Sequence, residues 1–112
     1  MNELQTTPRP VPMLVIYRVK AGNDARFVEL LKQHWPALRG IGLATETPAE
    51  IYRGESKRPA PGGGSIYVET FEWVDENAPN VAHQTPQVMA VWEPMGPILE
   101  GMELIALRPL DS

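Results

Sequence analysis

The stretch from Ser65 to Met95 constrains the fold more than any other part of the sequence. It opens with β-branched and aromatic side chains, which predict a strand over 65–74. The acidic turn at 75–77 that follows is typical of a helix start. Beyond it, apolar residues recur at helical spacing, at Val88, Val91, Trp92 and Met95. A strand therefore leads into a helical segment, and His83 lies close to the junction.

Prolines interrupt this helical segment at 79, 86, 94 and 97. A proline is tolerated in the first turn of a helix but breaks or kinks a helix interior. We therefore expect two short helical pieces, with Thr85 as the cap and Pro86 as the first position of the second piece.

The first two elements expected in the chain are a strand and a helix. Residues 13–20 predict a central strand covered on both sides, because both faces of the segment are apolar. A helix should follow the turn at 21–24, with Asn23 or Asp24 as its cap. It should kink or restart at Pro36 and end at the glycines at 40 and 42. Its buried stripe is expected to comprise Phe27, Leu30, Leu31, Trp35 and Leu38.

The remaining segments complete the element order. A weak strand is expected over 45–55, interrupted by Pro48, and a flexible loop over 57–64, which is rich in proline and glycine. The last strand is expected over 103–107. The order is then β-α-β-β-α-β, which predicts an α+β, ferredoxin-like fold with a four-stranded antiparallel sheet. The expected organisation is a flexible N-terminal arm over 1–12 and a single domain over 13–112.

The expected sheet has an apolar face on each side, although both helices cover the same side. An uncovered face of this kind is normally buried by a partner. We therefore expect a homodimer in which two sheets close on each other.

Composition excludes several classes of function. The net charge of −4 and the lack of a long basic run argue against nucleic-acid binding. The chain has no cysteine, and two isolated histidines do not form a metal-binding motif. No apolar run approaches the roughly 20 residues of a membrane span, and the N-terminus does not resemble a signal peptide. A cytoplasmic protein with no membrane association is the expectation.

The run Glu72-Trp73-Val74-Asp75 leading to His83, together with the length and element order, resembles the dimeric α/β-barrel superfamily. Within it, the chain looks most similar to antibiotic-biosynthesis-monooxygenase-like domains, over residues 13–108. The resemblance implies an organic ligand bound between helices and sheet within each protomer. Haem-degrading relatives use a helix histidine as the iron ligand, a tryptophan ten positions earlier and an asparagine on the first strand. Trp73 and His83 have that spacing, but residues 13–20 contain no asparagine.

His83 is the main candidate for a catalytic group, since a neutral imidazole can act as a general base or ligate iron near neutral pH. Asn80 would share a helical face with it and could orient a carbonyl or enolate oxygen. The alternative is that His83 bridges polar groups where the two helical pieces meet, and that Asn80 is exposed or caps a helix.

Four aromatic residues are candidates for a ligand pocket: Tyr17, Tyr67, Trp73 and Trp92. The alternative for each is ordinary packing in the core or at the dimer interface.

Three further residues carry polar expectations. His34 is interpreted as a helix-end histidine that interacts with the helix dipole, and the alternative is that it faces a ligand. Glu69 and Glu72 fall on opposite strand faces, so one of them points inward and needs a partner, for which Arg18 or Arg53 is expected.

Three functions are compatible with these features. The first is a monooxygenase-like enzyme, needing no cofactor, that acts on a small aromatic or polyketide-like compound. The second is a non-enzymatic dimer that binds a small apolar molecule or takes part in a stress response. The third is a haem-binding protein with His83 as iron ligand.

Overall fold

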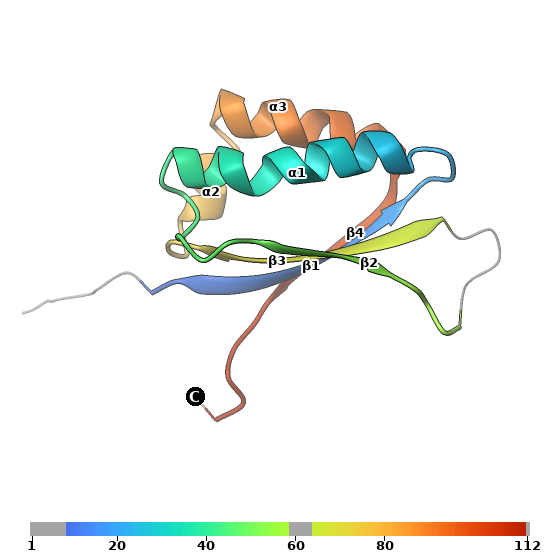
Figure 1. The fold of residues 1–112 in the computed structure, drawn as a ribbon. Coiled ribbons are helices and arrows are strands. Elements are labelled where there is room, and N and C mark those ends of the chain that lie inside the picture. The colour runs from blue at the N-terminus through green and yellow to red at the C-terminus, as the bar shows by residue number, and fades with distance from the viewer. Residues whose placement is uncertain (1–8, 59–63, 112) are drawn as a thin grey trace, which may run out of the picture.

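The computed structural model describes residues 9–58 and 64–111. Within them, the chain folds as the predicted α+β arrangement, with the three α-helices on one side of a four-stranded antiparallel sheet (Figure 1). The elements in chain order are β1 (Val11–Val19), α1 (Asp24–Gly40), β2 (Glu50–Gly54), β3 (Ser65–Trp73), α2 (Ala78–Ala82), α3 (Pro86–Met95), a short 3-10 turn (Gly96–Ile98) and β4 (Leu99–Ala106).

The strands lie in the order β2-β3-β1-β4, so β1 is central as predicted. It pairs with β3 from Val11 opposite Trp73 to Val19 opposite Ser65, and with β4 on its other side. Odd-numbered residues of β1 and β3 point toward the helices and are mostly buried, as a strand with one covered face requires. The even-numbered Leu14 and Ile16 lie on the other face and are only half-buried in a single chain.

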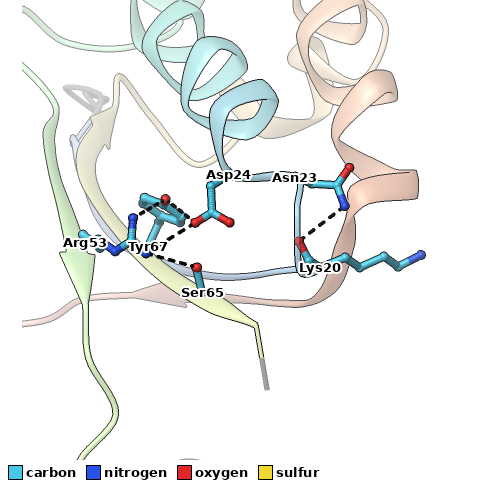
Figure 2. Close-up of polar contacts among 6 residues, drawn as sticks. All are labelled: Lys20, Asn23, Asp24, Arg53, Ser65 and Tyr67. Carbon is cyan, nitrogen blue, oxygen red and sulfur yellow. Dashed lines mark hydrogen bonds and ion pairs between the residues drawn. The ribbon is translucent and has the colours of Figure 1, made fainter. Parts of the chain in front are cut away.

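The helix α1 begins at Asp24, with Asn23 as its N-cap. Asn23 makes no side-chain cap bond. Its amide NH2 donates to the backbone oxygen of Lys20 at 3.3 Å (Figure 2) and to that of Ala21 at 3.2 Å. The helix then continues through Pro36 to Gly40, so the expected restart is wrong. Pro36 is exposed, so the carbonyl that loses its N–H partner lies on the solvent side, where water can satisfy it.

The second helical segment is divided as predicted. Asp75 stabilises the turn that leads into α2, since its Oδ1 accepts hydrogen bonds from the backbone N–H groups of Asn77 and Ala78, at 3.0 and 2.9 Å. The helix α3 starts with extended Thr85 as N-cap and Pro86 in its first turn.

Two strands differ in extent from the prediction. β2 is shorter than 45–55 and leaves Pro48 outside, because a proline cannot donate to the strand ladder. β4 begins at Leu99, four residues before the expected 103. Leu99 pairs with Val19 beyond a shift in strand register between Arg18 and Val19, which the sequence pattern does not reveal.

Some expectations concern residues outside the described part. Most of the predicted arm (residues 1–8) and the middle of the predicted loop (residues 59–63) lie there. Val11 already pairs with Trp73, inside the range expected for the arm. In the described ranges, none of the helices has the length and apolarity that crossing a membrane would require.

Candidate functional site

A cavity of about 630 Å³ lies between the helix-bearing face of the sheet and the helices. All three α-helices and strands β1, β3 and β4 contribute to its walls. Most of the lining is apolar: Val11, Met13, Val15, Tyr17, Phe71, Trp73, Pro79, Met89, Trp92, Met95, Leu99, Met102, Leu104 and Ala106. His34, His83, Asp75, Glu76, Glu93 and Gly96 complete it.

The sequence of α3 explains how one helix can both hold the fold and line a cavity. One stripe, formed by Val88, Val91 and Met95, is buried in the core. Met89, Trp92 and Glu93 form a neighbouring stripe at three- and four-residue steps that faces the cavity.

The edge strand β4 forms the open side of the cavity. Its cavity-facing side chains Met102 and Leu104 are 52% and 62% exposed, although they pair with the buried Tyr17 and Val15 of β1. A ligand can therefore reach the apolar interior past β4.

A buried polar cluster joins three elements beside this cavity. Glu69 of β3 is fully buried, and its Oε1 accepts a hydrogen bond of 2.7 Å from the Tyr17 hydroxyl of β1. Nδ1 of His34, on α1, lies 3.0 and 2.9 Å from the two carboxylate oxygens. The partners of the inward carboxylate are therefore Tyr17 and His34. The expected pairing with Arg18 or Arg53 is wrong, because Arg18 is exposed and Arg53 pairs with Asp24.

Tyr17 remains a hydrogen-bond donor in this cluster. Burial, and after it the charge and hydrogen bonding of Glu69, raise the pKa of the Tyr17 hydroxyl far above its usual value.

The geometry also orients the imidazole of His34. A carboxylate that faces Nδ1 favours the tautomer with its proton on that nitrogen, which leaves Nε2 as a hydrogen-bond acceptor. Nε2 is buried and has no hydrogen-bond partner in the described part of the chain. His34 also lines the cavity, with its ring packed 5.5 Å from that of Phe71 and 5.9 Å from that of Trp92. A histidine held by a carboxylate, with its second nitrogen free, has the arrangement of an oriented general base.

The expectation that His34 ends the helix is wrong, because α1 runs six residues further, to Gly40. His34 therefore sits in the helix interior, where its face of the helix packs on the sheet. His34 and Glu69 both occupy positions that the hydrophobic periodicity of their elements predicts to be buried. His34 extends the buried stripe of Leu30, Leu31 and Leu38, and Glu69 continues the buried alternation of β3. A polar residue at a core position is the signal that could have identified them.

His83, the residue singled out from the sequence, lines the same cavity from the end of α2. It is exposed, and its ring lies 4.8 Å from the ring of Trp92. Trp92 thus contacts both histidine rings. Asn80 is exposed and is not among the described residues that line the cavity. Its amide donates to Asn77 at 3.2 Å, so the structure does not bring Asn80 and His83 together over a ligand.

Among the aromatic candidates, Tyr17, Trp73 and Trp92 line the cavity. Tyr67 lies instead in a polar cluster at the start of α1 (Figure 2). Its hydroxyl donates to Asp24 at 2.7 Å and accepts from Arg53 at 3.2 Å, and Arg53 also contacts Asp24 at 3.6 Å and Ser65 at 3.4 Å. This cluster attaches the first residue of α1 to β2 and β3.

The described residues contain no group of three or more histidine, aspartate or glutamate side chains placed to hold a metal ion. A cofactor that needs one histidine ligand could contact His83 from the exposed side of the cavity.

Neither a scan against protein-family models nor a search of curated protein sequences found a match. Solved structures do match. The chain is similar to SnoaB of Streptomyces nogalater, described as a cofactor-independent oxygenase, with a TM-score of 0.68, 14% identity, and coverage of 92% of this chain and 95% of that one. It is also similar to an antibiotic biosynthesis monooxygenase, with a TM-score of 0.68, 12% identity and coverage of 89% and 98%.

A NIPSNAP family protein from Agrobacterium tumefaciens matches with a TM-score of 0.63, 13% identity and coverage of 97% and 93%. At these identities the likeness concerns the fold, and it agrees with the resemblance expected from the sequence. The chain has the ferredoxin-like fold of antibiotic biosynthesis monooxygenase domains.

Proposed function

We propose that this protein is a monooxygenase-like enzyme, independent of a cofactor, that acts on a small aromatic or polyketide-like compound. The observation that carries the proposal is the position of His34. Its Nδ1 is held by Glu69, its Nε2 is free in the described part of the chain, and its ring lines an apolar cavity. The fold shared with a cofactor-independent oxygenase supports the same conclusion.

In this proposal His34 is the general base. A substrate with an acidic C–H or O–H group places it at Nε2, and the imidazole takes up the proton. The positive charge that develops on the ring is stabilised by Glu69, which faces Nδ1, while the Tyr17 hydroxyl holds the carboxylate in place. The substrate becomes an electron-rich enolate or phenolate.

Such an anion can react with dioxygen without another electron donor. For a substrate with an activated methylene group, one molecule of substrate and one of dioxygen give one molecule of the corresponding ketone and one of water. The methylene carbon is oxidised, one oxygen atom enters the product, and the other leaves as water with both hydrogen atoms. The apolar walls, with the rings of Trp73 and Trp92, would hold an aromatic substrate and keep bulk water from the anion.

The test is oxygen consumption with an anthrone, a tricyclic aromatic compound with an activated methylene group. We expect the wild-type protein to consume one dioxygen per anthrone, and His34→Gln to bind the compound but turn it over at least about a hundredfold more slowly. His83→Ala is the matched control, because it removes a histidine that lines the same cavity without a carboxylate partner. Unchanged turnover in His34→Gln would sink the assignment, and loss of turnover only in His83→Ala would transfer the role to His83.

We also propose that the protein is a homodimer. The face of the sheet without helices carries apolar side chains that are only half-buried in one chain: Leu14, Ile16, Ile66, Val68 and Ile105. A second copy could cover this face. Native mass spectrometry should give twice the chain mass of 12.5 kDa, whereas a clean monomer at micromolar concentration would contradict the proposal.

A non-enzymatic role as a small-molecule-binding dimer is the main alternative. The apolar cavity favours it as well, because a cavity of this kind binds ligands whether or not it transforms them. It predicts that the His34→Gln variant still binds the metabolite found in the wild-type protein, and that neither protein consumes dioxygen.

A further inference from the structure

We infer that the cavity selects against anions, so that its ligand is an uncharged or cationic aromatic molecule without a carboxylate, phosphate or coenzyme A group. The inference rests on the proposed function for the identity of the site and adds the charge class of the substrate.

The first observation is the sign of the charges on the cavity wall. Three carboxylate residues line it, Asp75, Glu76 and Glu93, and none of the described lining residues is a lysine or arginine. Glu76 and Glu93 are exposed and form no ion pair with any described residue, so their charges are not neutralised locally. On the described part of this wall an anionic ligand would meet like charge and no lysine or arginine.

The second observation lies deeper in the cavity. Glu69 is fully buried behind His34, with hydrogen bonds from Tyr17 and an imidazole nitrogen as its partners. A ligand carboxylate brought near His34 would lose its hydration in an apolar environment and face this second carboxylate across the ring. An uncharged hydroxyl or acidic C–H group avoids both costs and can still interact with Nε2.

The third observation concerns shape. Every methionine in the described part of the chain lines the cavity, namely Met13, Met89, Met95 and Met102. Methionine is flexible and polarizable and adapts to irregular apolar ligands. A cavity with such adaptable walls discriminates weakly between ligand shapes. Charge is then the main property by which it can distinguish ligands of similar size.

The test uses three probes that share one naphthalene ring system: naphthol, naphthoate and naphthylmethylamine. At neutral pH they are uncharged, anionic and cationic. Binding to the full-length wild-type protein is followed by tryptophan fluorescence at low salt, because Trp73 and Trp92 line the cavity. We expect naphthoate to bind at least about tenfold more weakly than both other probes. Loss of hydration alone would weaken the binding of the anion and the cation alike, whereas repulsion by the wall carboxylates would weaken only that of the anion. The affinity for the amine therefore distinguishes desolvation from charge repulsion.

The double variant Glu76→Gln/Glu93→Gln isolates the contribution of the wall. It should bind naphthoate several-fold more tightly than the wild type does, and the amine more weakly. The matched control is Glu46→Gln/Glu55→Gln, which changes the net charge equally at exposed positions outside the cavity lining and should leave the order unchanged.

Equal binding of naphthoate and naphthol, an unaltered ratio in the double variant, or no binding of any probe would each overturn the inference. These results are separable from the proposed function. The expected binding order without any oxygen consumption would overturn only the enzymatic proposal. Turnover that depends on His34, combined with tight naphthoate binding, would overturn only the charge selection.

Discussion

Nδ1 of His34 lies 2.9 Å from Oε2 of Glu69, and the two side chains are 4% and 0% exposed. The contact joins the middle of α1 to the middle of β3, across 35 positions of sequence. A buried carboxylate is costly unless its oxygens are hydrogen-bonded, and here His34 and Tyr17 supply the donors. The cluster therefore fixes both the packing of α1 on the sheet and the direction of the imidazole.

Replacing Glu69 with glutamine should separate the effect of its charge on the reaction from its structural role. The amide keeps the size of the side chain but removes the negative charge that faces Nδ1 of His34. We expect kcat for anthrone oxidation to fall by roughly a hundredfold or more while KM changes little, because the substrate contacts are retained. Steady-state oxygen consumption measures both constants, and circular dichroism checks that the variant is folded. If KM rose by a similar factor while kcat stayed unchanged, Glu69 would act on substrate binding and not on the base.

Tyr17→Phe should destabilise the fold. The substitution removes the hydroxyl that donates to Glu69 at 2.7 Å and leaves a buried oxygen with one donor fewer. We expect the free energy of unfolding to fall by about 1–3 kcal/mol, as for other buried hydrogen bonds to charged groups. Urea titration gives the change. Tyr52→Phe is the control, since Tyr52 is 51% exposed and its substitution should change stability by less than about 0.5 kcal/mol.

The same tyrosine should make the fold sensitive to alkali. Its pKa is raised in the folded state by burial and by Glu69, so above the ordinary value of 10.0 the unfolded chain loses a proton that the folded chain keeps. The contribution of this group is full below about pH 10 and decreases as the pH rises further. The pKa of Tyr67 shifts in the same direction, mainly through burial and Asp24. Unfolding midpoints measured on both sides of this pH should fall less steeply in Tyr17→Phe than in wild type; parallel curves would contradict the assignment.

Acid should act through the cluster at the start of α1. Hydrogen bonds from Ser65 and Tyr67, and then the charge of Arg53, hold the pKa of Asp24 below its usual 3.8. A carboxyl group with a lowered pKa stabilises the fold above its unfolded value, and that contribution is lost as the pH falls below it. Asp24→Asn should therefore show a flatter decline in stability below about pH 4 than wild type. Glu50→Gln, at an exposed position of β2, is a control that should retain the wild-type slope.

The sequence predicts the fold better than it predicts the site. The physical reason is that the helix and strand signals act between neighbouring residues, whereas the site depends on contacts between residues far apart in the sequence. The division of the second helical segment at Thr85 and Pro86 is predictable because a cap and a first-turn proline act within one turn. The pairing of His34 with Glu69 depends on how α1 sits on the sheet, which no local pattern specifies. Pro36 added to the difficulty, because it favours a helix that ends or restarts near His34, whereas α1 continues to Gly40. His83 follows a recognisable acidic turn, which makes it a candidate from local sequence. His34 lies within an apolar stripe, where the pattern predicts core packing.

Haem binding is the remaining hypothesis that one variant can decide. His83 lines the cavity, is exposed, and makes no hydrogen bond with other described side chains, so its imidazole is available to an iron ion. If His83 is the ligand, adding haemin should produce a Soret band that reaches saturation at one haem per chain and disappears in His83→Ala. His34→Gln serves as the control, because Nδ1 of His34 is held by Glu69 and its ring is buried. A band that persists in His83→Ala would indicate non-specific uptake by the apolar cavity. A band lost only in His34→Gln would mean that the buried histidine turns outward to bind iron, which would also count against its assignment as a base held in place by Glu69.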